Sequence, residues 1–196
     1  MILPIIAYGD PVLRKDCEPI SEAYPNLKEL IANMYETMYD AFGVGLAAPQ
    51  VGLPIRLFVI DTTAFAEDED LAKEEQEQLK DFKRVFINAE ILEETGDEWA
   101  FNEGCLSIPD VREDVFRKPR LKMKYQDEDF KPHVEEFEGL VARVIQHEYD
   151  HIDGILFTDK LSTFKKRLIK SRFVNISKGN ISVDYKMRFP AMKKKR

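Results

Sequence analysis

Two histidines four residues apart, His147 and His151, constrain this chain more than any other feature. On a helix, residues with this spacing lie on one face, so both imidazoles can bind the same metal ion. Glu148 lies between them, where a carboxylate can accept a proton from water at that metal. Leu140 and Val144 continue the same face upstream, which predicts an amphipathic helix whose ligand-bearing side points inward. The chain has only three histidines, which favours a metal site over two histidines buried in a core.

A tetrahedral catalytic site takes a third protein ligand, and the sequence restricts where that ligand can lie. No glutamate follows Glu148, and position 157, where a metzincin-type peptidase has its third histidine, is Phe157. Asp159 and Asp184 remain as downstream candidates without a supporting motif. Upstream, Cys105 would supply a soft thiolate ligand, although an isolated cysteine is more often an inert buried thiol.

A segment rich in small residues, 43–52, surrounds the amide side chain of Gln50 with three glycines and two alanines. Small residues allow a substrate chain to lie against the backbone. The amide can donate a hydrogen bond to a developing negative charge without adding charge itself. Alone, the segment would fit equally well as a helix end followed by a turn into a strand.

Three segments in this order resemble the peptide deformylase family: Gly-x-Gly-x-Ala-x-x-Gln at 43–50, Glu-Gly-Cys-Leu-Ser at 103–107 and Gln-His-Glu-x-Asp-His at 146–151. The resemblance covers roughly residues 4–170. It implies a metal-dependent hydrolase that removes the N-formyl group from the N-terminal methionine of newly made proteins and releases formate. An acidic insertion at 64–82 and a tail beyond about 174 depart from the common bacterial pattern.

The resemblance also implies a role for each residue of the site. One divalent metal ion would be held by three protein ligands: Cys105, His147 and His151. Glu148 would move the proton, while the Gln50 amide and the backbone N–H of Leu106 would stabilise the oxyanion. The family tends to use ferrous iron, and the softness of these ligands also permits zinc, nickel or cobalt.

For the substrate, the resemblance implies an apolar slot for the methionine side chain near Val44, Leu140 and Val144. Each of these residues, taken singly, would also suit ordinary core packing. Gly45 would pair with the substrate backbone as a strand partner. Arg112 would lie at the rim, where a solvated charge is an equally good interpretation. Distinguishing a formyl group from an acetyl group would depend on roughly one methyl, a difference in binding free energy of about 1–3 kcal/mol.

Length and composition predict one domain spanning 1–196, with a basic helix and tail from about 162. A hydrophobic content of 44% and an aromatic content of 11% argue against disorder. Two distant cysteines form no disulfide framework, and without a signal peptide they indicate a reducing, cytoplasmic location. The apolar start, residues 1–7, is too short to span a bilayer, so a membrane is not an expected partner. DNA is not an expected partner either.

Charge is unevenly distributed along this chain, whose net charge is −7. Residues 64–82 hold eight acids against two lysines, whereas the stretch from residue 160 onward holds thirteen Lys and Arg against one acid. A basic end can bind RNA, so contact with ribosomal RNA is one expectation for an enzyme that acts on nascent chains. A solvated charged tail is the alternative.

Periodicity predicts helices over 26–42, 137–150 and 164–173, and strands over 55–61, 84–92 and 121–126. The first motif is expected in the loop behind the first helix, and Cys105 at the edge of another extended segment. The acidic insertion is expected to form either a helix or a mobile loop. We therefore expect an α+β fold, with short antiparallel sheets packed around a central helix that carries the His-Glu-x-x-His motif, as the resemblance also implies.

Two other classes of protein share part of this pattern. A zinc endopeptidase would have the same helix, but it normally takes its third ligand downstream, where the usual histidine and glutamate are missing. A non-catalytic, ribosome-associated binding module would explain the basic end. It would not explain a full ligand set accompanied by Glu148 and Gln50.

Overall fold

Three small sheets form the β-structure of the computed structural model, which describes residues 1–69 and 71–190. The five strands of the main antiparallel sheet, in spatial order, are β2 (Gly45–Ala47), β3 (Leu57–Asp61), β4 (Lys83–Thr95), β7 (Arg120–Gln126) and β8 (Pro132–Glu138). A separate antiparallel hairpin consists of β5 (Trp99–Cys105) and β6 (Ile108–Arg117). Near the two ends of the chain, β1 (Ile5–Ile6) pairs in parallel with β9 (Met187–Arg188).

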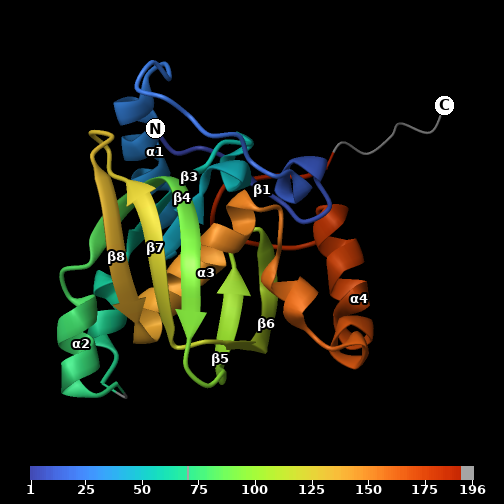
Figure 1. Cartoon of the computed structure of the whole chain (residues 1–196). Coiled ribbons are helices and arrows are strands. Elements are labelled where there is room, and N and C mark those ends of the chain that lie inside the picture. The colour runs from blue at the N-terminus through green and yellow to red at the C-terminus, as the bar shows by residue number, and fades with distance from the viewer. Residues whose placement is uncertain (70, 191–196) are drawn as a thin grey trace.

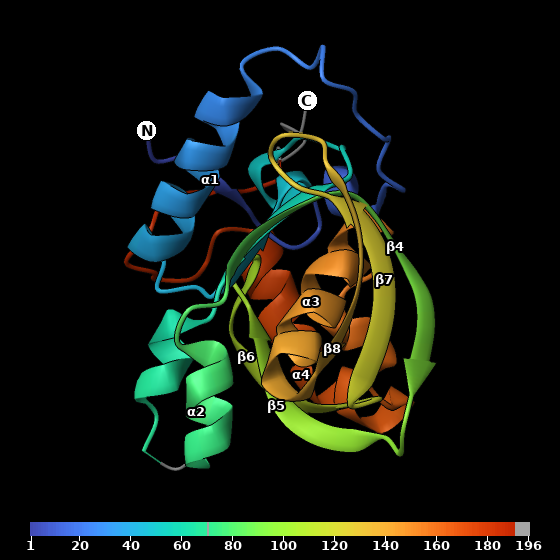
Figure 2. The same cartoon turned by 60° about the vertical axis from the view of Figure 1, so that its left-hand side comes forward.

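The α-helices of the described residues are α1 (Leu27–Asp40), α2 (Lys73–Leu79), α3 (Gly139–Ile152) and α4 (Thr163–Ser177). Short 3₁₀ turns lie between them: η1 (Pro11–Arg14), η2 (Ala48–Val51), η3 (Thr63–Glu67) and η4 (Phe157–Lys160). Figures 1 and 2 show α3 in the centre, with the main sheet on one side and the β5–β6 hairpin on the other. This is the α+β arrangement predicted from the sequence.

The central helix α3 differs from its prediction in two respects. It begins at Gly139, whose φ of +62° turns the chain out of β8, so residues 137 and 138 belong to the strand. The helix is also buried almost all round, because residues 140–146 are all buried between the sheet and the hairpin. An amphipathic helix would expose the polar residues opposite its ligand-bearing side. In this structure they are enclosed, and they need partners inside the protein.

The remaining predicted elements are present with shifted bounds. The first helix and the strands at 55–61, 84–92 and 121–126 correspond to α1, β3, β4 and β7. The first motif is not only a loop, because it forms the edge strand β2 and the turn η2. The acidic insertion forms η3 and α2, and Leu79 anchors it with a side chain that is 1% exposed.

The basic end of the chain forms α4 and then a return segment. Ile169 and Ile176 bury one side of α4, while Phe164 and Leu168 are exposed. Residues 178–190 then run back along the molecule, and Figure 2 shows this red segment passing beside α1. The last part of the predicted tail, 191–196, lies outside the described residues. No helix in the described part of the chain has the length and apolar character needed to cross a membrane.

Candidate metal centre and substrate cavity

Three side chains with metal-binding donor atoms converge where β5 ends against α3. The ligand atoms of Cys105, His147 and His151 all lie within 4.8 Å of one another. The Cys105 Sγ atom is 3.3 Å from Nε2 of His151, and the two imidazole rings are 5.2 Å apart. One thiolate and two imidazoles fit a divalent transition metal, and three protein donors leave a position for water or substrate.

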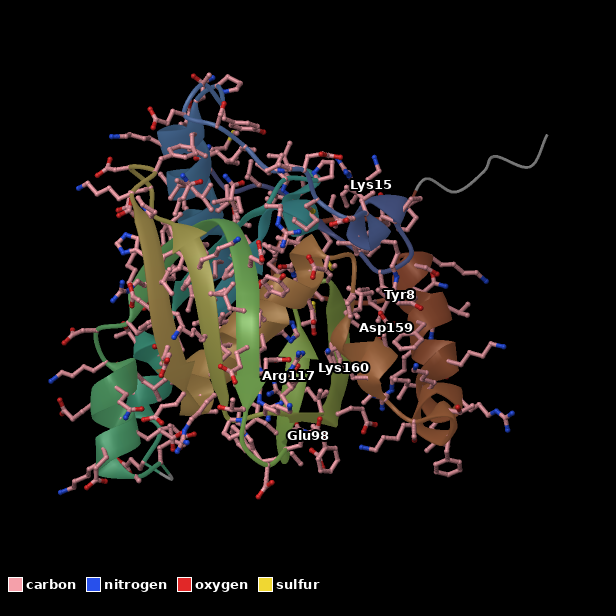
Figure 3. All side chains as sticks on the ribbon, in the orientation of Figure 1. Tyr8, Lys15, Glu98, Arg117, Asp159 and Lys160 are labelled. Carbon is pink, nitrogen blue, oxygen red and sulfur yellow. The ribbon has the colours of Figure 1, made fainter. Side chains whose placement is uncertain are left out.

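The two downstream candidates for the third ligand do not join this group. Asp159 is engaged elsewhere, because it pairs with Arg14 and accepts the backbone N–H of Leu156 at 2.9 Å. Asp159, labelled in Figure 3, belongs to η4. Asp184 is exposed and lines the nearby cavity without contributing to the cluster. Among the described residues, Cys105 is the third member.

A buried carboxylate orients one of the histidines. Nδ1 of His147 lies 2.9 Å from Oε2 of Glu103, which leaves Nε2 of the ring for the metal. Glu103 also accepts hydrogen bonds from Arg117, at 2.7 and 3.0 Å, and from Arg143, at 3.0 Å. Burial by itself would raise the pKa of Glu103, but the contacts with His147 and Arg117 hold it well below its usual range. Glu103 therefore stays charged and fixes the ring.

The same arginine extends this network to a second carboxylate. Arg117 donates to Asp150 at 2.7 Å, and Lys160 lies 3.3 Å from the same carboxylate oxygen. Figure 3 shows Arg117 and Lys160 side by side. Each buried charge of this network has an opposite partner, as charges removed from water require. Sequence reasoning missed this network, although Glu103 and Asp150 both lie within the quoted motifs.

Glu148 occupies a buried position without a full set of partners. Its Oε2 atom has no hydrogen-bond partner among the described residues, and burial raises the pKa of this carboxyl to about 7. A Cβ atom at Gly45 would lie 2.5 Å from Oε1 of Glu148, so the close approach of β2 requires glycine there. A carboxyl with this pKa can both accept and return a proton near neutral pH.

Gln50 and the turn after Cys105 complete the inner surface of the site. The Oε1 atom of Gln50 accepts the backbone N–H of Ala47 at 2.8 Å, which directs Nε2 toward Cys105 Sγ, 3.5 Å away. The Leu106 carbonyl accepts a hydrogen bond from the Tyr185 hydroxyl at 2.8 Å. The next carbonyl, that of Ser107, accepts the backbone N–H of Tyr8 at 2.9 Å. Segments near both ends of the chain therefore fix this turn.

A cavity of about 520 Å³ opens beside the cluster. Its wall contains most of the predicted site residues, namely Val44, Gly45, Gln50, Cys105, Leu106, Arg112, Val144, His147 and Glu148. Arg112 lies at the rim and donates to the side chain and backbone oxygens of Asn102, at 3.0 and 2.7 Å. His151 is buried beneath this wall at 1% exposure.

One predicted slot residue lies outside the cavity wall, and several wall residues were missed. Among the described residues, Leu140 does not line this cavity, although it packs in the same hydrophobic core as Val144, one helical turn further along. The cavity is lined instead by aromatic and C-terminal residues that carry no motif, among them Phe42, Phe65, Phe101, Val183 and Tyr185. Long-range packing brings them together, so no local sequence signal identifies them.

Comparison with known proteins decides the family. A family model described as polypeptide deformylase matches residues 2–167. The chain belongs to the peptide deformylase family. A deformylase from Christiangramia forsetii and one from Flavobacterium johnsoniae are each 66% identical to it over 196 residues, covering 100% of both chains. These alignments run through the acidic insertion and the basic tail.

Solved deformylase structures share the fold as well. The enzyme from Thermus thermophilus has a TM-score of 0.78 at 40% identity, covering 91% of this chain and 99% of that one. The Legionella pneumophila deformylase has a TM-score of 0.77 at 37% identity, covering 92% of this chain and 98% of its own. The resemblance drawn from the three motifs is therefore confirmed.

Proposed function

We propose that Cys105, His147 and His151 hold the metal of a deformylase active site that opens into the 520 Å³ cavity. The protein is a metal-dependent hydrolase that removes the N-formyl group from newly made proteins and releases formate. The observation that carries the site assignment is the convergence of three donor atoms within 4.8 Å beside a buried carboxylate. Deformylase chemistry requires such a centre and a group that can move a proton.

A cation held by these three residues would supply Lewis acidity, which would lower the pKa of water and polarise the formyl carbonyl. We propose ferrous iron on grounds of family membership, and the thiolate and imidazole donors also accept zinc, nickel or cobalt. Glu103 supports this role by holding His147 in one tautomer.

Glu148 moves the proton in this proposal. Water attacks the formyl carbon, and the proton that it loses passes to Oε2 of Glu148. The carboxyl then returns that proton to the departing amine nitrogen, which leaves a free methionine N-terminus. A pKa of about 7 suits both transfers, and the unpartnered Oε2 atom is available to make them.

Two donors face the position where negative charge develops. The Nε2 amide of Gln50 points toward Cys105, and the backbone N–H of Leu106 has no acceptor among the described residues. Both are fixed before the substrate arrives, Gln50 by Ala47 and Leu106 by Tyr185. Donors that need no reorganisation favour the oxyanion over the ground-state carbonyl.

Replacing Gln50 with alanine is expected to lower kcat roughly 100-fold while KM changes little, because the lost hydrogen bond matters mainly in the transition state. Steady-state formate release measures both constants. Gln146→Ala is the matched control, since it removes a buried amide that bonds to Glu94 and Lys118 instead. An effect confined to KM would make Gln50 a ground-state binding residue.

The substrate position follows from the edge of the main sheet. β2 is an edge strand, so Gly45 can receive the substrate backbone as an added strand. We propose that the methionine side chain enters the cavity between Val44 and Val144, and that Arg112 borders its rim. A free strand edge next to the metal cluster is the feature that supports this placement.

Formate release separates this function from that of an endopeptidase. The metal-loaded protein is expected to release formate from a formyl-Met-Ala-Ser peptide and to leave its peptide bonds intact. The acetylated peptide should react at least about tenfold more slowly, since one additional methyl must fit the same space. Cleavage between residues without formate release would show a peptidase instead.

We propose that α4 brings the enzyme to its substrate by resting on ribosomal RNA in the cytoplasm. Several basic side chains of α4 are already engaged by contacts within the protein. Lys165 pairs with Glu113, Lys166 donates to Asp159, and Arg172 donates to the carbonyl of Asp110. Within the described residues, the exposed basic side chains on or just beyond α4 that form no ion pair or side-chain hydrogen bond are Arg167, Lys170 and Lys178.

Reversing Arg167, Lys170 and Lys178 to glutamate is expected to weaken co-sedimentation with ribosomes, because phosphate contacts depend on these charges and on salt. Formate release from a short peptide should stay unchanged. The same reversal at Lys15, Lys28 and Lys131, three exposed lysines elsewhere, controls for net charge. Equal co-sedimentation of both triple variants would leave α4 as a solvated charged surface.

A further inference from the structure

The C-terminus of α1, at the mouth of the cavity, has an unusual residue directly after its cap. The helix ends in a Schellman motif, in which the N–H of Gly43 donates to the Met38 carbonyl at 2.9 Å and the N–H of Phe42 donates to the Tyr39 carbonyl at 3.0 Å. The residue after the cap in this motif is usually glycine, because its backbone is left-handed. Here that residue is Phe42, with a φ of +55°. A side chain in this conformation costs free energy.

The ring of Phe42 offers no burial to offset that strain. Its side chain is 90% exposed, more than any other large apolar residue in the described part of the chain. Exposed single apolar residues are common, but here the ring gains no burial on folding that would offset the strain of the positive φ. Strained positions of this kind concentrate where a protein contacts a ligand.

Phe42 lies beside the path proposed for the substrate. The residue lines the cavity and immediately precedes Gly43, Val44 and Gly45, the segment along which the substrate backbone is proposed to lie. The cavity walls come close together beside it, since a Cβ atom at Gly43 would lie 2.8 Å from Cδ1 of Leu106. A chain leaving the metal cluster along this segment would pass over the exposed ring.

We propose that Phe42 is a specificity-determining residue whose ring packs on an apolar side chain of the nascent protein downstream of its formylmethionine. This inference rests on the proposed function, because it takes the occupant of the cavity to be a formylated peptide. The ring becomes buried only when substrate binds, which provides the stabilisation that the free protein lacks. Phe42 therefore acts on KM and on the choice among nascent chains, and it leaves the proton transfers at Glu148 unchanged.

Replacing Phe42 with glycine separates this role from a structural one, because the two expected effects have opposite signs. Tm should rise by about 2–4 °C, since glycine adopts the left-handed conformation without strain. KM for formyl-Met-Leu-Phe should rise about fivefold to tenfold with kcat unchanged, the scale of an apolar contact of partial burial. KM for formyl-Met-Gly-Gly, which offers no apolar partner, should stay within about twofold.

Phe42→Ala completes the design, because it removes the ring and keeps the strained backbone. It should raise KM as the glycine variant does, without the rise in Tm. Phe116→Ala removes another exposed ring, outside the described cavity wall, and should change neither constant. Calorimetric titration with the unformylated product peptide Met-Leu-Phe gives the same comparison without turnover.

Three results would overturn the inference. An unchanged KM for formyl-Met-Leu-Phe in both variants would mean that the ring does not contact substrate. A fall in Tm for Phe42→Gly would mean that the ring is structural. If the metal-loaded wild-type protein released no formate from either peptide, the proposed function would fail and this inference with it, whereas the first two results apply to an active enzyme.

Discussion

Replacing Glu148 with alanine is expected to lower kcat about 10²–10⁴-fold while the metal stays bound. The carboxyl is buried beside the three proposed ligands without being one of them, and its raised pKa of about 7 suits a group that gains and loses a proton in each cycle. Formate release gives the rate, and elemental analysis of the same sample gives the metal content.

Glu148→Gln is the sharper version of this experiment. The amide keeps the shape of the side chain and its fit against Gly45, but it cannot accept the proton. We expect it to be as impaired as the alanine variant, with the same metal content. Near-normal turnover in the glutamine variant would remove Glu148 from the mechanism.

Replacing Cys105 with alanine is expected to abolish both metal retention and formate release. The thiolate is one of the three proposed protein donors, so its loss should leave two imidazoles that cannot hold the cation against a chelator. Metal content after desalting with a chelator, compared with the wild-type protein, measures the effect directly.

The chain supplies a matched control in Cys17, its only other cysteine. That thiol is buried away from the cluster, and burial raises its pKa to about 11, so it remains a neutral thiol. Cys17→Ala should keep the full metal content and activity. If Cys105→Ala also kept full occupancy, Cys105 would be structural and the ligand set would be wrong.

The sequence predicted the parts of the site that depend on local spacing. His147 and His151 lie four residues apart, so any helix through them brings both rings to one face, and the structure has that helix. Cys105 required the family resemblance, because the distance between β5 and α3 is not encoded in any local pattern. Gln50 was singled out as an amide among small residues, but the contact that directs it toward Cys105 is tertiary.

Features that depend on long-range packing could not be predicted in this way. Glu103, Arg117 and Asp150 look like ordinary charged residues in the sequence, and only the packing of the hairpin on α3 encloses them. The pairing of β1 with β9 joins opposite ends of the chain and carries Tyr185 to the active-site turn. Phe42 was predicted as the last residue of the helix over 26–42. The structure ends α1 at Asp40 and places Phe42 in the left-handed conformation, which a phenylalanine rarely adopts.

We propose that one metal ion, held by Cys105, His147 and His151, makes this chain a deformylase. Titrating ferrous iron into the metal-free protein under anaerobic conditions, while measuring formate release from formyl-Met-Ala-Ser, tests it most directly. We expect no release without metal and a linear rise that stops at one equivalent per chain. Formate release that is independent of added metal, or that needs two equivalents, would contradict the account.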